Sequence, residues 1–193
     1  MIMLESTFTE TTLPHNYFKL IFTNTNGTCC YHSILKLLRK HGLVKKNMNT
    51  KIIQAKAVNW IIHNKNLYLD TFNLTLQDYV LYNHSLDSFS DYITNYKQYS
   101  ADNGSISWGG IPELIALSHI YNININIYTG KAYDKKNHRL IKGTIVNNKT
   151  RKDFRFQLLV TTTRQYNITV NLLYIKINPY LSHFIALDDN INY

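Results

Sequence analysis

The sequence contains few cysteines, glycines and prolines, and no long apolar run. Its only two cysteines, Cys29 and Cys30, are neighbours, and a disulfide between sequence neighbours would be strained. A disulfide framework is therefore excluded, and a reducing compartment is favoured. No apolar stretch approaches membrane-spanning length, and residues 1–25 lack the basic start and apolar core of a secretory signal. We expect a soluble, cytoplasmic protein with no membrane attachment.

Acidic side chains are also scarce, since 12 Asp and Glu face 21 Lys and Arg and leave a net charge of +9. The charges are separated along the chain: residues 131–155 are strongly basic and residues 65–113 are acidic. We expect an electrostatically two-sided molecule. Its 193 residues can bury a sizeable core without the disulfides or metal ions that small domains need. We predict an N-terminal tail at residues 1–15 and a single domain at residues 16–193, without internal repeats or linkers.

The hydrophobic pattern changes character along the chain. Helical spacing of apolar residues fills the first two thirds, with Ser85 as the expected cap of one helix, Gly42 and Asn122 as helix ends and Pro112 near a helix start. Residues 123–128 alternate apolar and polar side chains and predict a strand. The sequence thus predicts an α+β domain with helices packed on a small, mostly antiparallel sheet. Expected helices are 29–41, 51–63, 86–96 and 111–121, with a short helix or turn at 75–82. Expected strands are 18–22, 123–128, 139–146, 154–160, 168–177 and 182–187.

The most informative stretch is the polar turn of residues 24–33, which leads directly into a helix. Asn and Gly permit a tight turn, and Thr28 is an acceptable N-cap. Cys29 then stands in the first helical turn, where the helix dipole favours a thiolate. This is the usual setting of a cysteine nucleophile. The alternative is that Cys29 and Cys30 are small buried hydrophobic residues.

A cysteine nucleophile needs a base, and histidine is the usual one. His183 opens a short apolar strand directly after a proline-containing turn, a rigid position from which an imidazole can face another element. His32 lies one turn from Cys29 on the same helix, whereas nothing distinguishes the surroundings of His84 or His119. His183 is therefore the candidate base, and the alternative is a core histidine.

Trp108, Gly109 and Gly110 follow a polar segment, residues 101–107, that is expected to be a loop. Two consecutive glycines let another backbone approach closely, as a substrate tail made of small residues would require. The alternative is a buried tryptophan followed by a turn.

These blocks together resemble the ovarian tumour (OTU) family of cysteine proteases. Residues 26–33 are similar to the family's nucleophile motif. Trp108-Gly109-Gly110, with the helix and strand that follow, is similar to its central block. Ser182-His183-Phe184 is similar to its terminal histidine strand. The blocks occur in the family's order and span most of the chain. The compact spacing is most similar to the small viral OTU deubiquitinases.

The resemblance implies a papain-like fold and hydrolysis after the C-terminal Gly-Gly of ubiquitin or a ubiquitin-like protein. It implies Cys29 as nucleophile, His183 as general base, and Asn26 in the oxyanion-hole loop or as an orienting group. It also places Trp108, Gly109 and Gly110 along the substrate tail. No metal or organic cofactor is implied, the partner is ubiquitin or its conjugates, and we expect a monomer, in the host cytoplasm if the protein is viral.

Two positions depart from the family pattern. Asn26 replaces an aspartate, and Ile185 stands where many members have the acid that orients the histidine. An apolar side chain cannot accept a hydrogen bond from the imidazole. Either another group orients His183, or the enzyme uses a Cys/His dyad. The candidates for another group are Asn26, Asn178, Asp188 and Asp189.

Three other functions remain open at this point. Ile185 favours a catalytically weak or dead module that binds ubiquitin. A viral domain of this type could also process its own polyprotein. The basic segment 131–155 could bind nucleic acid by neutralising phosphates, although a solvated surface is the preferred interpretation. For a deubiquitinase, the acidic segment 65–113 could attract the arginine-containing tail of ubiquitin, although an ordinary solvated face is the preferred interpretation of any single carboxylate there.

Overall fold

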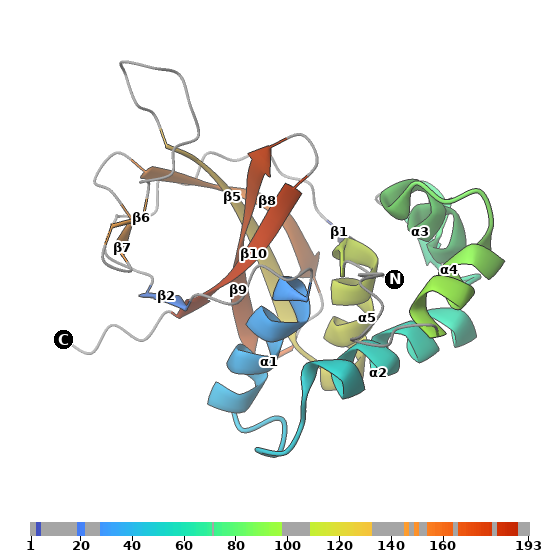
Figure 1. Cartoon of the computed structure of the whole chain (residues 1–193), viewed down its shortest axis with the longest axis horizontal. Helices are drawn as coiled ribbons and strands as arrows, with labels where there is room; N and C mark the ends of the chain where they lie inside the picture. Colours follow the sequence, from blue (N-terminus) through green and yellow to red (C-terminus); the bar gives the residue numbers. More distant parts are fainter. Residues whose placement is uncertain are drawn as a thin grey trace.

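The structure is a computed structural model and describes residues 3–4, 19–21, 28–70, 72–97, 109–132, 145–146, 149–150, 154–163, 166–178 and 181–188 (Figure 1). Asn26 and Trp108, the expected loop 101–107 and most of the expected strand 139–146 lie outside these residues. Five helices fall within the described part of the chain: α1 Cys29–Lys40, α2 Thr50–His63, α3 Leu76–His84, α4 Phe89–Lys97 and α5 Ile111–Tyr121.

The main sheet has six strands in the order β1-β8-β5-β9-β10-β2. All neighbouring pairs are antiparallel except β5 and β9, which run parallel. The predicted α+β class with a mostly antiparallel sheet is therefore confirmed. The strands are β1 Met3–Leu4, β2 Lys19–Ile21, β5 Asn124–Ala132, β8 Phe154–Thr163, β9 Thr169–Asn178 and β10 Leu181–Asp188; β3 Tyr68–Leu69 pairs with β4 Leu74–Thr75, and β6 Ile145–Val146 with β7 Lys149–Thr150.

The helices divide into two groups (Figure 1). Helix α1 packs against β10 and β9, and α2 packs against α5. Helices α3 and α4 form a helical arm, residues 76–97, on the side of the molecule away from the sheet. Helix α5 connects the two groups, because its start contacts the arm and its end leads into β5.

Several predicted helix ends are confirmed by local geometry. Gly42 and Asn122 have φ values of 67° and 51°, the left-handed conformation that ends a helix. Ser85 was expected to start α4, and that prediction is wrong. Ser85 instead ends α3 with a φ of 52°, and α4 is capped by Ser88, whose Oγ accepts from the Asp91 N–H at 3.2 Å. Serine is a good N-cap residue at either position. The two positions differ only in the length of the turn between α3 and α4.

Strand β10 is buried on both faces, which fixes its position in the sheet. Phe184 and Ala186 pack into the main core with α1, while Ile185 and Leu187 are buried on the opposite face. A register shift of one residue would turn every one of these side chains to the other face. The strand that carries His183 is therefore firmly placed against the nucleophile helix.

Candidate active site

Cys29 is the first residue of α1, as predicted. Thr28 occupies the N-cap position, but its side chain makes no capping bond; its carbonyl accepts from the His32 N–H at 2.9 Å. Cys29 is only 3% exposed, and its neighbours on the helix are buried in the main core. The sulfur thus stands at the junction between the helix start and the sheet.

The first turn of α1 contacts the backbone of β10 directly. The Phe184 N–H donates to Cys29 Sγ at 3.5 Å, and Ser33 Oγ donates to the Phe184 carbonyl at 2.9 Å. Among the described residues, strand β2 pairs with residues 186–188 of β10. At Phe184, side chains of the helix start satisfy the backbone N–H and carbonyl of β10. This arrangement brings Cys29 next to the residue that follows His183.

His183 is buried, with 6% of its surface exposed. The pairing between β10 and β9 shifts between Leu181 and Ser182, directly before His183, and such bulges often redirect a side chain beside an active site. Burial lowers the pKa of His183, and no carboxylate of the described residues contributes to that shift. The imidazole is therefore neutral near pH 7 and able to accept a proton.

The state of the Cys29 thiol differs from the sequence-based expectation. Burial raises its pKa, although the Phe184 N–H and the backbone at Cys30 and Cys29 partly offset this. Removing the sulfur from water thus outweighs the helix start, which was expected to favour the thiolate. We therefore expect a neutral Cys29 thiol and a neutral His183 imidazole in the free protein.

We expect this neutral pair to show in the pH dependence of Cys29 alkylation by iodoacetamide. The thiolate is the reactive form, so the rate should rise by about tenfold per pH unit from pH 6 toward the raised pKa of the thiol. A stored thiolate would instead give a plateau that begins below pH 6. The rate is measured by intact mass, with Cys29→Ala as the control that assigns the reaction to this residue.

Cys30 is fully buried, and burial followed by the charges of Cys29 and Glu113 raises its pKa well above that of an ordinary thiol. A thiol that is buried and protonated is unreactive. Cys30 is therefore a small buried core residue, which was the alternative expectation for the two cysteines. Cys29 remains the candidate nucleophile.

Gly109 and Gly110 lie against the helices on both sides. A Cβ atom at Gly109 would stand 2.8 Å from the buried Tyr31 ring and 3.2 Å from Cys30 Cβ, and one at Gly110 would stand 2.5 Å from Asn83 Oδ1. Because the two glycines lack a side chain, α1 and the end of α3 can pack directly against their backbone. The Gly109–Gly110 backbone borders the first turn of the nucleophile helix.

The structure adds a buried cluster that the sequence did not suggest. Glu113 is fully buried, and its carboxylate accepts from the Gly110 N–H at 2.6 Å and from Tyr92 Oη at 2.8 Å. His84 Nε2 lies 3.0 Å from Glu113 Oε1. A glutamate three residues after a helix N-cap is half of a capping box, so its bond to Gly110 could have been predicted. The contacts with His84 and Tyr92 join different helices, so no pattern of neighbouring residues could have predicted them.

The described residues provide no acid for His183. Ile185 is 1% exposed and apolar, and Asp188 pairs with Lys40 at the other end of α1. Asp188 lies five residues from His183 on an extended strand, or roughly 16 Å, so this candidate is wrong. Asn26 and Asp189 lie outside the described residues, as does the side chain of Asn178. Whether one of these groups orients His183 stays a prediction.

The sequence model of the OTU-like cysteine proteases matches residues 24–163, more than half of the chain. The chain belongs to this family. His183 lies beyond the matched residues and is assigned by its place on β10. No curated protein sequence matches the chain.

Solved structures of OTU domains share the fold. The viral OTU protease of Taggert virus is 11% identical, with a TM-score of 0.59 over 100% of this chain and 96% of that one. The Qalyub virus protease is 15% identical, with a TM-score of 0.53 over 97% and 98%. The Hazara virus OTU, solved bound to ubiquitin, is 13% identical, with a TM-score of 0.53 over 90% and 82%. At these identities the similarity shows the fold alone.

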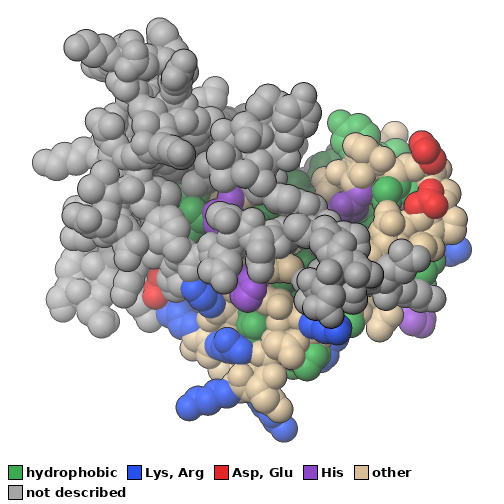
Figure 2. Space-filling model, viewed as in Figure 1, with side chains coloured by type: hydrophobic (Ala, Val, Ile, Leu, Met, Phe, Trp, Pro, Cys, Tyr) green, Lys and Arg blue, Asp and Glu red, His purple; other side chains and the backbone are tan. Residues whose placement is uncertain are grey.

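Among the described residues, basic and acidic side chains gather mainly in different places (Figure 2). Lysine and arginine side chains gather over the end of α1 and the start of α2, where the exposed ones are Arg39, Lys40, Lys45, Lys46 and Lys51. Asp78, Asp87 and Asp91 are exposed on the helical arm and its connection. Glu113 was counted in the acidic segment but is buried. The side chains of the basic segment 131–155 and of Asp102 lie outside the described residues.

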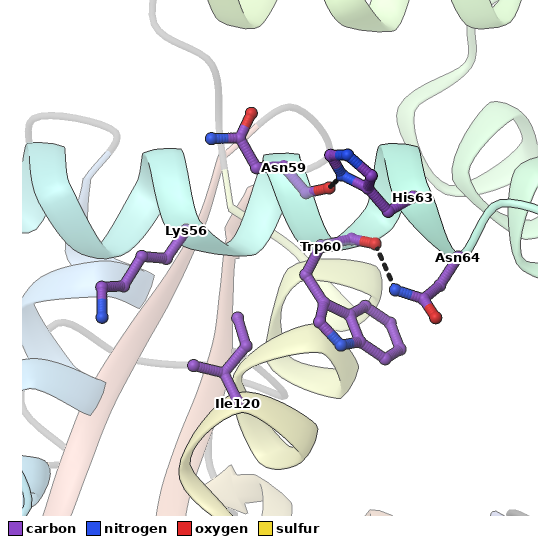
Figure 3. A pocket seen from close by; sticks show the side chains of 6 residues that line it. All are labelled: Lys56, Asn59, Trp60, His63, Asn64 and Ile120. Atoms are coloured by element: carbon purple, nitrogen blue, oxygen red, sulfur yellow. Dashed lines mark hydrogen bonds between the residues drawn. The ribbon is translucent and has the colours of Figure 1, made fainter.

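A pocket of about 350 Å³ lies where α2 meets Ile120 of α5 (Figure 3). The Trp60 indole points toward Ile120 of α5, and its ring lies 4.5 Å from that of His119. The pocket has few polar atoms and contains neither candidate catalytic residue.

Among the described residues, no group of three or more His, Cys, Asp or Glu side chains could hold a metal ion. Within the same part of the chain, no helix combines the length and apolar character needed to cross a membrane.

Proposed function

We propose that this OTU domain is a deubiquitinating cysteine protease that hydrolyses the bond after the C-terminal Gly-Gly of ubiquitin or a ubiquitin-like protein. The observation that carries the proposal is the contact between the Phe184 N–H and Cys29 Sγ. It brings the helix-start cysteine and the histidine strand together, as cysteine-protease chemistry requires. The Hazara virus OTU, which shares the fold and was solved bound to ubiquitin, supports the choice of substrate.

The proposed reaction starts from the neutral pair. Cys29 Sγ attacks the carbonyl carbon of the terminal glycine while the thiol proton passes to the imidazole of His183. The tetrahedral intermediate collapses, His183 donates that proton to the leaving amine, and the acyl group remains on Cys29 as a thioester. Water then attacks the thioester as His183 accepts its proton, and the thiol and the ubiquitin carboxylate are released. Backbone N–H groups at Cys29 and Asn26 would stabilise the oxyanion.

Reaction with a ubiquitin that carries a C-terminal electrophile tests the proposal. We expect the wild-type protein and Cys30→Ala to gain the mass of one ubiquitin, and Cys29→Ala to gain none. Cys30→Ala is the matched control, because it removes the neighbouring thiol and leaves the proposed nucleophile. An adduct that persists in Cys29→Ala would contradict the assignment of the nucleophile.

A ubiquitin-binding module without activity is the second candidate, and the buried Ile185 favours it. The same experiment separates the two. A folded wild-type protein that binds ubiquitin in a titration but forms no adduct would support the binding module and overturn the protease.

A further inference from the structure

The Glu113 carboxylate is fully buried and makes hydrogen bonds to three different groups. Its oxygens accept from a backbone N–H at Gly110 and from the Tyr92 hydroxyl, and they lie 3.0 and 3.2 Å from His84 Nε2. Both oxygens are therefore used. A fully buried carboxylate is costly unless it is paired and hydrogen-bonded. The cost of losing a partner therefore holds Gly110, Tyr92 and His84 in fixed positions around Glu113.

The cluster connects three helices to one backbone position. His84 ends α3, Tyr92 belongs to α4 and Glu113 stands in the first turn of α5. Capping α5 requires only the bond to Gly110. The two further contacts instead join Gly110 to the helical arm, which lies on the opposite side of the glycines from Cys29.

The two glycines are held from the other directions as well. The space beside Gly109 is filled by the Tyr31 ring of the nucleophile helix, and the space beside Gly110 by Asn83 of α3. Tyr31 is fully buried, so its ring has little room to move away from Gly109. The position of the Gly109–Gly110 backbone relative to Cys29 is thus set by packing on one side and by Glu113 on the other.

We propose that Glu113, together with His84 and Tyr92, is a positioning residue that fixes the Gly109–Gly110 backbone as the surface along which the C-terminal tail of ubiquitin is laid toward Cys29. This inference rests on the proposed function. Glu113 acts through Gly110, without contact with the reacting atoms. Its loss shifts the tail relative to Cys29, and small shifts of a bound reactant reduce rates strongly.

The test compares a large reagent that needs the tail surface with a small one that does not. Electrophilic ubiquitin reports on the placement of the tail, whereas iodoacetamide reports only on the Cys29 thiol. We expect Glu113→Gln to slow the ubiquitin reaction by roughly 10- to 100-fold and Tyr92→Phe to slow it by about threefold or more. Both variants should keep the wild-type alkylation rate of Cys29 within about twofold.

Tyr128→Phe is the matched control, since it also removes a buried tyrosine hydroxyl but lies on β5. It should react like the wild type with both reagents. Tyr92→Phe keeps the test decisive if Glu113→Gln does not fold, because it removes one hydroxyl and preserves the ring.

The outcomes separate this inference from the proposed function. A wild-type protein that is alkylated by iodoacetamide but never reacts with electrophilic ubiquitin overturns both. A reactive wild type whose Glu113→Gln and Tyr92→Phe variants match its rate overturns the positioning role alone. Equal losses with both reagents would show a general structural role and would also overturn it.

Discussion

Replacing His183 by asparagine is expected to reduce kcat/KM for a fluorogenic ubiquitin substrate by roughly a thousandfold. We expect this effect to be large because the raised pKa of Cys29 disfavours a stored thiolate, so the attack depends on a base. Asparagine fills similar space at this buried position but cannot take the proton. The measurement is steady-state hydrolysis at pH 7.5.

His32→Asn is the control for this variant, since His32 lies on the nucleophile helix, one turn from Cys29. We expect it to keep activity within about threefold of the wild type. Iodoacetamide alkylation at pH 9.5 checks that the His183→Asn site is still assembled. If His32→Asn lost activity and His183→Asn retained it, the base would be misassigned.

His84→Ala is expected to lower the free energy of unfolding by about 3–5 kcal/mol, because it leaves the buried Glu113 carboxylate without its charged partner. Burial opposes the charge on His84, but the Glu113 carboxylate outweighs it and raises the pKa of His84. Burial likewise opposes the charge on Glu113, and His84 with the Gly110 and Tyr92 donors holds its pKa below the usual range. Urea unfolding of the wild type and the variant across pH measures the effect.

The sign of the pH dependence follows from these two directions. The contribution of His84 is complete below its unfolded pKa of about 6.5 and is lost as the pH rises through its raised folded pKa. The contribution of Glu113 is complete above its unfolded pKa of about 4.3 and is lost as the pH falls through its lowered folded pKa. The difference between wild type and variant should therefore be largest between about pH 4.3 and 6.5.

His63→Ala, at an exposed position near the end of α2, is the control and should change the free energy of unfolding by no more than about 0.5 kcal/mol. A penalty for His84→Ala that stays constant from pH 5 to pH 9 would mean that the imidazole contributes packing and no charge.

The sequence predicted those features that depend on neighbouring residues. Apolar spacing located α1, α2, α5 and β5, and the helix ends at Gly42 and Asn122 were correctly expected. Cys29 at the start of α1 was predicted for the same reason. The expected cap at Ser85 was wrong, because Ser88, which is the same residue type three positions further on, caps α4 instead.

Features that depend on tertiary structure were missed. The pKa of Cys29 is set by burial against β10, 155 positions away in the chain, and sequence reasoning weighed only the helix dipole. His84 seemed ordinary because Glu113 is 29 positions away. The acidic segment 65–113 was interpreted as a surface, although one of its carboxylates is internal. Local patterns carry no information on which polar groups the fold will enclose.

The contact between Cys29 and Phe184 also bears on how the protein is made. During synthesis the ribosome releases α1 long before β10, so a nascent chain carries the sulfur without the imidazole that is proposed to activate it. Without β10, the thiol would lack the base that the proposed reaction requires. The order of the elements would thus delay the proposed activity until β10 has joined the sheet.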